Sequence, residues 1–210
     1  MSTIVSIKQL SQHVGETVTV RGWLANRRSS GKIQFPLMRD GSGMLQCVVL
    51  KKNFPEDLYK ELDGLPYEST LEVTGEVRAE ERAVGGFEME LTDSKVIQRA
   101  HDEYPISKKD HGPDFLLNNR HLWLRSKKQA AIMRIRDEVI RAIRDFFYER
   151  DFVNVDAPVF TPNACEGTTN LFEVDYFGDP CYLTQSGQLY MEAAAMALGK
   201  VYCFGPAFRA

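Results

Sequence analysis

The stretch Thr161–Ala210 reads TPNACEGTTNLFEVDYFGDPCYLTQSGQLYMEAAAMALGKVYCFGPAFRA and contains three features that suit one binding site. The first is an acidic glycine loop at Glu166-Gly167. A polar Gln-Ser-Gly-Gln turn then begins a predicted helix from about 187 to 198, with Ser186 as its N-cap. The third is a strand that ends in Phe208-Arg209. Together they predict the beginning of a polar binding site, and the sequence stops directly after its most suggestive arginine.

A long helix and a short strand precede this stretch. Ser126 is typical of a helix N-cap, and the run from there to Arg150 carries apolar residues at three- and four-residue spacing: Ile132, Ile135, Val139, Ala142, Ile143 and Phe146. Charges of both signs on the other face are more typical of solvated ion pairs than of a nucleic-acid stripe. A strand, 152–155, follows and ends at Ala157-Pro158. This segment therefore predicts an amphipathic helix that leads into a short strand.

Residues 1–100 have the pattern of a small β-barrel. Alternation and turn residues indicate strands at 17–24, 33–39, 44–50, 70–79 and 87–97, with a short helix at 55–62. This is the layout of an OB-fold, a barrel that often binds oligonucleotides. Residues 101–125 lose the periodicity and carry Pro105, Gly112 and Pro113, as a linker or hinge does. We expect an α+β multidomain chain, with an OB-fold over 1–100, a linker over 101–125 and a second domain over 126–210.

Composition narrows the function classes. The net charge of −3 over 210 residues gives no overall electrostatic sign of a nucleic-acid partner. The four cysteines have no C-x-x-C spacing, which argues against zinc and favours free thiols in a reducing compartment. The N-terminus lacks a secretory pattern and no apolar run reaches 18 residues, so we expect a cytoplasmic protein with no membrane partner.

The order of these elements resembles the N-terminal half of the class IIb aminoacyl-tRNA synthetases, most closely the asparaginyl-tRNA synthetases. Phe152–Pro158, FVNVDAP, is similar to the family's motif 1, whose proline ends a strand at the dimer interface. Phe208-Arg209-Ala210 is similar to the start of motif 2. The resemblance covers nearly the whole chain, and it implies an OB-fold anticodon-binding domain followed by the beginning of an antiparallel-sheet catalytic domain. It also implies a homodimer that forms through motif 1 around Pro158, although Asp151 replaces the glycine that usually opens that motif.

The resemblance also implies an activity. Amino-acid activation is an in-line attack of a carboxylate on the α-phosphate of ATP, and it needs positioning and charge neutralisation rather than a protein nucleophile. Arg209 matches the motif 2 arginine that contacts ATP, and Glu166, Ser186 and Gln188 match positions around the substrate amino acid. Taken alone, each has a plainer reading, as a surface arginine, a loop carboxylate, an N-cap and a first-turn glutamine. The family requires ATP and Mg²⁺, and we expect no metal ligands within residues 1–210.

One position bears on the choice of amino acid. Aspartyl-tRNA synthetases place a lysine after Gln-Leu-Tyr or Gln-Leu-Phe, and that lysine pairs with the substrate carboxylate. Here Met191 occupies the position, and a methionine cannot neutralise a buried carboxylate. We therefore expect asparagine as the substrate and tRNA(Asn) as the partner. An aspartyl-tRNA synthetase, including one that charges both tRNAs, is the alternative.

The barrel carries residues that suit RNA. Five basic residues fall between positions 21 and 39, with no acid among them: Arg21, Arg27, Arg28, Lys32 and Arg39. RNA phosphates are bound by such side chains, and unpaired bases by stacking and edge hydrogen bonds. The resemblance implies anticodon contacts at Arg27, Phe35, Gln46 and Glu88, with Phe35 and Gln46 on the central base. Phe35 shares a strand face with Ile33 and Leu37, so barrel core is its alternative reading.

Motif 3 of the family, with a second ATP-binding arginine, is not found in these residues. We therefore expect the 210-residue chain alone to be inactive in ATP–pyrophosphate exchange. A non-catalytic OB-fold module that binds tRNA or single-stranded nucleic acid remains the alternative from a different functional class.

Overall fold

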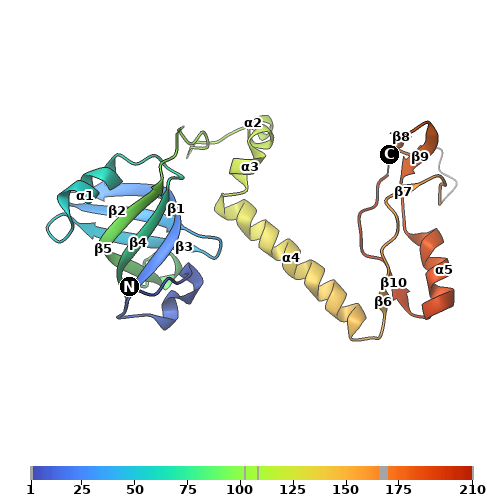
Figure 1. Cartoon of the computed structure of the whole chain (residues 1–210), viewed down its shortest axis with the longest axis horizontal. Coiled ribbons are helices and arrows are strands. Elements are labelled where there is room, and N and C mark those ends of the chain that lie inside the picture. Colours follow the sequence, from blue (N-terminus) through green and yellow to red (C-terminus); the bar gives the residue numbers. More distant parts are fainter. Residues whose placement is uncertain (1, 102, 108, 166–169, 210) are drawn as a thin grey trace. The chain divides into compact units, whose positions relative to one another are not determined.

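The computed structural model describes residues 2–101, 103–107, 109–165 and 170–209. The chain divides into two compact units, Met1–Gly112 and Pro113–Ala210 (Figure 1). Their boundary falls inside the segment 101–125. We describe each unit separately.

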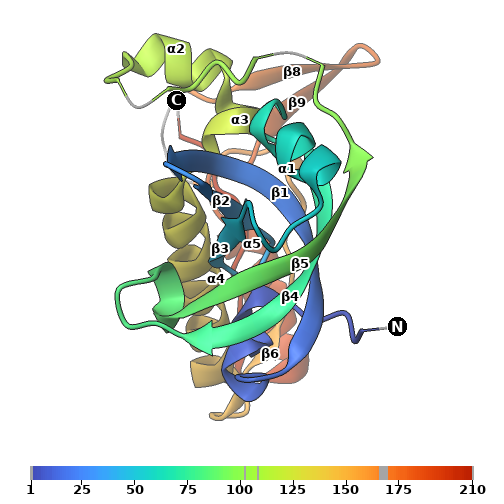
Figure 2. The same ribbon diagram turned by 90° about the vertical axis from the view of Figure 1, so that its left-hand side faces the viewer.

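The first unit is a five-stranded closed barrel with the order β1-β2-β3-β5-β4. Its strands are β1 (Thr17–Ser30), β2 (Ile33–Arg39), β3 (Met44–Leu50), β4 (Thr70–Ala79) and β5 (Phe87–Gln98). All neighbouring strands are antiparallel except β3 and β5. The helix α1 (Glu56–Asp63) lies between β3 and β4, and two 3₁₀ helices, η1 (Ile7–Gln12) and η2 (Val84–Gly86), complete the unit. The long β4–β5 pair lies across the front of the barrel in Figure 2. This confirms the predicted OB-fold.

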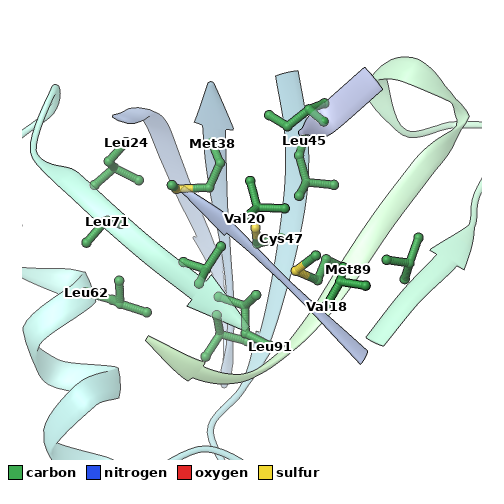
Figure 3. Close-up of a cluster of buried hydrophobic side chains, with 14 of the residues drawn as sticks. Val18, Val20, Leu24, Met38, Leu45, Cys47, Leu62, Leu71, Met89 and Leu91 are labelled. Carbon is green, nitrogen blue, oxygen red and sulfur yellow. The ribbon is translucent and has the colours of Figure 1, made fainter. Parts of the chain in front are cut away.

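The barrel interior holds the hydrophobic core of the described residues. Side chains that point inward from every strand fill it, including Val20, Met38, Cys47, Leu71 and Met89, each of which is fully buried (Figure 3). They alternate along the strands with outward side chains, as the period-two geometry of a strand requires. The hydrophobic effect therefore stabilises this unit and fixes which residues its outer surface presents.

Two glycines allow strands of the barrel to approach closely. A Cβ atom on Gly22 of β1 would lie 2.4 Å from the carbonyl oxygen of Arg39, and one on Gly75 of β4 would lie 2.2 Å from that of Glu90. Gly75 borders an irregularity, because the β4–β5 register shifts between Thr74 and Gly75, and Gly22 lies two residues before the β1–β2 shift between Leu24 and Asn26. Glycine is required there because any side chain would meet backbone atoms.

The second unit contains helices and short strands. Its helices are α2 (Pro113–Asn118), α3 (Arg120–Trp123), α4 (Lys127–Tyr148) and α5 (Gln188–Leu198). The strands β7 (Phe160–Thr161), β9 (Asp179–Leu183) and β8 (Glu173–Tyr176) form an antiparallel sheet in that order, and β6 (Val153–Asn154) pairs in parallel with β10 (Val201–Tyr202). The mixed α+β class is as predicted.

Several local predictions can be compared with the structure. Ser126 is the N-cap of α4, and its side chain accepts a hydrogen bond from the Gln129 backbone N–H. The prediction that Ser186 caps α5 is wrong, because the N-cap is Gly187. Ser186 lies one residue earlier, where its Oγ still accepts a 3.3 Å hydrogen bond from the Gln188 N–H. Within the predicted linker, 113–118 and 120–123 are helical.

Candidate functional site

Phe35 lies on the outer surface of the barrel. On β2 the buried residues are Gln34, Pro36 and Met38, so Phe35 points outward with Ile33 and Leu37 and is partly exposed. Pro36 leaves the strand register unchanged, since Gln34 pairs with Val49 and Leu37 with Gln46, which is the same register on both sides of the proline. The alternative of a core phenylalanine is therefore wrong, and the ring is available on the sheet surface.

Phe35 is part of a row of interacting side chains that crosses four strands. The guanidinium carbon of Arg28, its cross-strand neighbour on β1, lies 4.3 Å from the ring centre. Arg28 Nη2 donates a 3.1 Å hydrogen bond to Gln46 Oε1 on β3, and Gln46 Nε2 donates one of 3.3 Å to Glu88 Oε2 on β5. The structure thus brings Phe35, Gln46 and Glu88 together, and their connecting residue is Arg28.

The row offers the contacts that an unpaired RNA base uses. An aromatic ring and a guanidinium plane supply stacking surfaces, and an amide beside a carboxylate supplies donors and acceptors for a base edge. Arg28 was not among the predicted contacts, although it belongs to the basic run. Arg28 is identified by the strand register, which places it directly opposite Phe35.

Arg27 has a different environment. Its guanidinium donates to the carbonyl oxygens of Leu62 and Leu65 and lies 4.0 Å from the carboxylate of Asp63. Only 19% of its side chain is exposed. Arg27 therefore holds the loop between α1 and β4, and the structure does not bring it to the row of Phe35, Gln46 and Glu88.

In the second unit, the start of α5 gathers polar groups. Cys165 Sγ contacts Gln188 Oε1 at 3.6 Å, and Gln188 Nε2 donates a 3.1 Å hydrogen bond to Glu192 Oε1. Both ends of the Gln188 amide are thus fixed. Met191 lies three residues beyond Gln188 and so on the same helix face, between Gln188 and Glu192 in sequence. Glu192 and Cys165 were not among the predicted site residues. The i, i+4 spacing of Gln188 and Glu192 is the sequence feature that identifies Glu192.

The segment carrying Arg209 lies beside the same turn. The prediction of a strand ending at Phe208-Arg209 is wrong, because β10 ends at Tyr202 and residues 203–209 form no strand. The Phe208 N–H donates a 2.8 Å hydrogen bond to the Thr184 carbonyl, and the hydroxyl of Thr184 donates one of 2.7 Å to the Ser186 carbonyl. Arg209 follows Phe208 and is exposed. Glu166 lies outside the described residues, and its neighbour Cys165 is the last described residue before it. Ser186, Gln188, Met191 and Arg209 are therefore placed around one segment of chain.

A cavity of about 510 Å³ adjoins the turn. Its lining includes Arg144 of α4, Asp156, Ser186, Gly187 and Cys203. Gly187 is tightly packed there, because a Cβ atom would lie 3.0 Å from Cys203 Sγ and 3.1 Å from Ala157 Cβ. The volume is within the range of small-molecule sites, and the lining offers one cation and one anion beside the turn.

Among the described residues, neither a shifted pKa nor a group of metal ligands gives these sites a further reactive group. Burial, reinforced by the nearby Glu88 carboxylate, raises the pKa of the Cys47 thiol inside the barrel, so that this thiol stays neutral. In the part of the chain that the structure describes, no three His, Cys, Asp or Glu side chains are grouped to hold a metal ion. Nor does any described helix combine the length and apolar character of a membrane span.

Comparisons with known proteins agree with this geometry. Residues 112–210 match the family model described as "tRNA synthetases class II (D, K and N)", and residues 18–97 match "OB-fold nucleic acid binding domain". The chain is 54% identical over 209 residues to an asparagine–tRNA ligase of Koribacter versatilis, covering 99% of this chain and 47% of the relative. It is 57% identical over 206 residues to one of Pelotomaculum thermopropionicum, covering 98% of this chain and 48% of the relative.

A solved structure gives the same picture. Asparaginyl-tRNA synthetase from Pyrococcus horikoshii, complexed with asparaginyl-adenylate, is 36% identical with a TM-score of 0.88, over 98% of this chain and 48% of that one. The chain thus spans about half the length of the curated relatives it matches. On these matches, the chain combines an OB-fold nucleic-acid-binding domain over residues 18–97 with a class II tRNA synthetase domain of the D, K and N group over residues 112–210.

Proposed function

We propose that the chain is part of an asparagine–tRNA ligase, which activates asparagine with ATP to an aminoacyl-adenylate and transfers the amino acid to tRNA(Asn). The observation that carries the choice of asparagine is the charge on the first turns of α5. Gln188 and Glu192 point to one another there, Met191 lies on the same face, and α5 contains no lysine or arginine. A substrate carboxylate at this face would meet the like charge of Glu192 without a cation on α5 to compensate, whereas a neutral amide would carry no such charge.

The turn at Ser186 and Gln188 is proposed to line the amino-acid pocket, with Glu166 beside it from the preceding loop. The fixed amide of Gln188 can offer the substrate an oriented donor and acceptor, and Cys165 and Glu192 keep that orientation. Because reactive groups held in place lose less entropy on reaching the transition state, this rigidity favours the reaction.

Arg209 is proposed to bind ATP. A guanidinium is permanently charged and can form two parallel hydrogen bonds to phosphate oxygens, so it neutralises charge on the α-phosphate as the substrate carboxylate attacks. Class II synthetases also use Mg²⁺, which would neutralise phosphate charge when bound. The described residues hold no group of three potential metal ligands, so we assign none of them to the ion.

The outer row of the barrel is proposed to bind the anticodon. Phe35 with Arg28 would stack the central uridine, Gln46 would bind its edge, and Glu88 would contact the first anticodon base. We propose that Arg27 supports this surface indirectly, since it fixes the loop after α1.

Assembly and location complete the proposal. Apolar side chains of α4 and of the motif 1 strand are well exposed, for example Ile135 at 64% and Val153 at 45%, and a homodimer through motif 1 and Pro158 would cover part of this surface. All four cysteines are free, which fits the reducing cytoplasm.

The proposal can be tested with the protein extended to the full length of its relatives. We expect ATP–pyrophosphate exchange that depends on asparagine and is at least tenfold weaker with aspartate. Replacing Met191 by Lys should weaken asparagine-dependent exchange and raise the aspartate rate. Preference of the unaltered protein for aspartate would overturn the argument, and absence of any exchange alongside intact RNA binding would favour a stand-alone binding module.

A further inference from the structure

The outer surface of β1 and β2 carries a second pair of an aromatic ring and an arginine. Trp23 on β1 is the direct cross-strand neighbour of Arg39 on β2, as Arg28 is of Phe35. The guanidinium carbon of Arg39 lies 5.4 Å from the centre of the Trp23 ring. The two pairs share the same construction, with the aromatic residue and the arginine exchanged between the strands.

Both pairs lie on the same face of the sheet. On β2, Phe35 and Arg39 alternate with the buried residues Pro36 and Met38, so both point outward. Trp23 lies between the buried Gly22 and Leu24 and is 40% exposed. A large indole that keeps this much of its surface in water, on a face continuous with the Phe35 row, is available to a ligand that crosses the sheet.

The second pair is held in place by a residue that adopts an unfavourable backbone conformation. Glu68 has a φ of +68°, which is sterically costly for any residue with a Cβ atom. Its N–H donates a 2.8 Å hydrogen bond to the Leu24 carbonyl, and its carboxylate pairs with Arg39 Nη2 at 2.7 Å. The side chains of Arg39 and Glu68 are only 16% and 9% exposed. The guanidinium is thus fixed beside Trp23, and its charge is largely balanced by Glu68.

We propose that Trp23 and Arg39 form a second base-stacking site, which binds an unpaired base of the same RNA strand outside the anticodon triplet. This inference rests on the proposed anticodon function of Phe35. Because Glu68 balances the charge of Arg39, the site suits the flat face of a base better than a phosphate. Stacking on an aromatic ring or a guanidinium plane does not depend on base identity, so the site would not select a sequence.

The spacing along β2 gives the separation of the two bound bases. Arg39 lies four positions after Phe35, which corresponds to about 13 Å of strand. A stacked nucleic-acid strand rises by about 3.4 Å for each nucleotide, so this distance spans roughly four nucleotides. With the central anticodon base on Phe35, a base at Trp23 lies beyond the triplet, about three to four nucleotides from its centre.

The test uses the intrinsic fluorescence of the site. The chain has two tryptophans, Trp23 and Trp123, so Trp123→Phe leaves Trp23 as the only reporter. Two RNAs are titrated, one of five nucleotides centred on the anticodon and one of eleven with the same centre. We expect the longer RNA to quench Trp23 and to bind more tightly, while the shorter one binds without quenching. An abasic nucleotide placed about four positions from the centre should remove the quench, and an exchange of the base there should not.

Variants separate this inference from the proposed function. With binding of the variants followed by the anisotropy of a labelled RNA, Trp23→Leu should weaken binding of the longer RNA roughly 5- to 150-fold, as expected for one base stack, and leave the shorter RNA unaffected. Trp23→Phe should restore most of the loss, and Ile97→Ala, which removes an exposed apolar side chain of β5, should change neither RNA. Phe35→Leu should weaken both. If Trp23→Leu weakens both RNAs equally or neither, with the fold intact by circular dichroism, the second site is refuted. If Phe35→Leu has no effect, the proposed anticodon function itself fails.

Discussion

The close approach of β1 and β2 at Gly22 makes a stability prediction. In Gly22→Ala the new methyl group would lie 2.4 Å from the Arg39 carbonyl oxygen and 3.0 Å from its carbonyl carbon. Ordinary van der Waals contact begins near 3.4 Å, so β2 must retreat by about 1 Å, because a backbone carbonyl cannot rotate away as a side chain can. This retreat affects the adjacent pairs Trp23–Arg39 and Leu24–Met38.

The magnitude follows from three contributions. Overpacking costs about 1–3 kcal/mol, and weakening of two ladder hydrogen bonds costs about 1 kcal/mol each. The smaller backbone entropy of alanine in the unfolded chain offsets this by up to about 1 kcal/mol. We expect the free energy of unfolding of the barrel to fall by about 3 kcal/mol, which a domain of ordinary stability survives at 25 °C.

The assay is urea unfolding of the first unit, followed by Trp23 fluorescence in the Trp123→Phe background. Gly41→Ala is the matched control, because its Cβ atom would meet no atom within 4 Å and its φ is not positive. The control should change the free energy of unfolding by less than about 0.5 kcal/mol. A loss below about 1 kcal/mol in Gly22→Ala, or equal losses in the two variants, would refute the steric reasoning.

Three further predictions concern a carboxylate, a thiol and a helix cap. Burial alone would raise the pKa of Asp40, but hydrogen bonds from the Ile7 N–H and from Ser42 outweigh it, so the pKa is lowered. The ionised carboxylate therefore stabilises the fold above its ordinary pKa of 3.8, and this stabilisation is lost as the pH falls through the lowered pKa. Between about pH 5 and pH 3 the urea midpoint should therefore change less in Asp40→Asn than in the unaltered chain. Cys47, whose buried thiol stays neutral, should remain unlabelled by iodoacetamide at about pH 8 in the folded chain, as mass spectrometry can check. Ser126→Ala should cost α4 about 1 kcal/mol, and faster amide exchange in its first turn would report the lost cap.

The barrel could be predicted from sequence because its signals are local. The strands β2, β3 and β4 have the predicted limits, since each is bounded by turn residues and alternates buried with outward side chains. The two-residue strands β6, β7 and β10 are too short for a periodic signal, and they depend on partners far along the chain. Ser186 was predicted as a cap for the same reason that Ser126 was, yet the backbone turns one residue later there.

The outer row of the barrel depends on a feature that residue patterns do not record. Uninterrupted alternation along β1 from Trp23 would point Arg27 outward, opposite Phe35. The register shift between Leu24 and Asn26 adds one residue on β1, and it is Arg28 that pairs with Phe35. The side-chain period in a strand is two, so one extra residue exchanges the two faces. Arg27 accordingly points to the α1–β4 loop, while Arg28 links Phe35 to Gln46. Two adjacent arginines, alike in sequence, thus acquire different roles from a single bulge.

The same bulge lies between the two aromatic–arginine pairs and sets both on one face of the sheet. The RNA surface proposed for this barrel therefore depends on its backbone geometry as much as on its residue types.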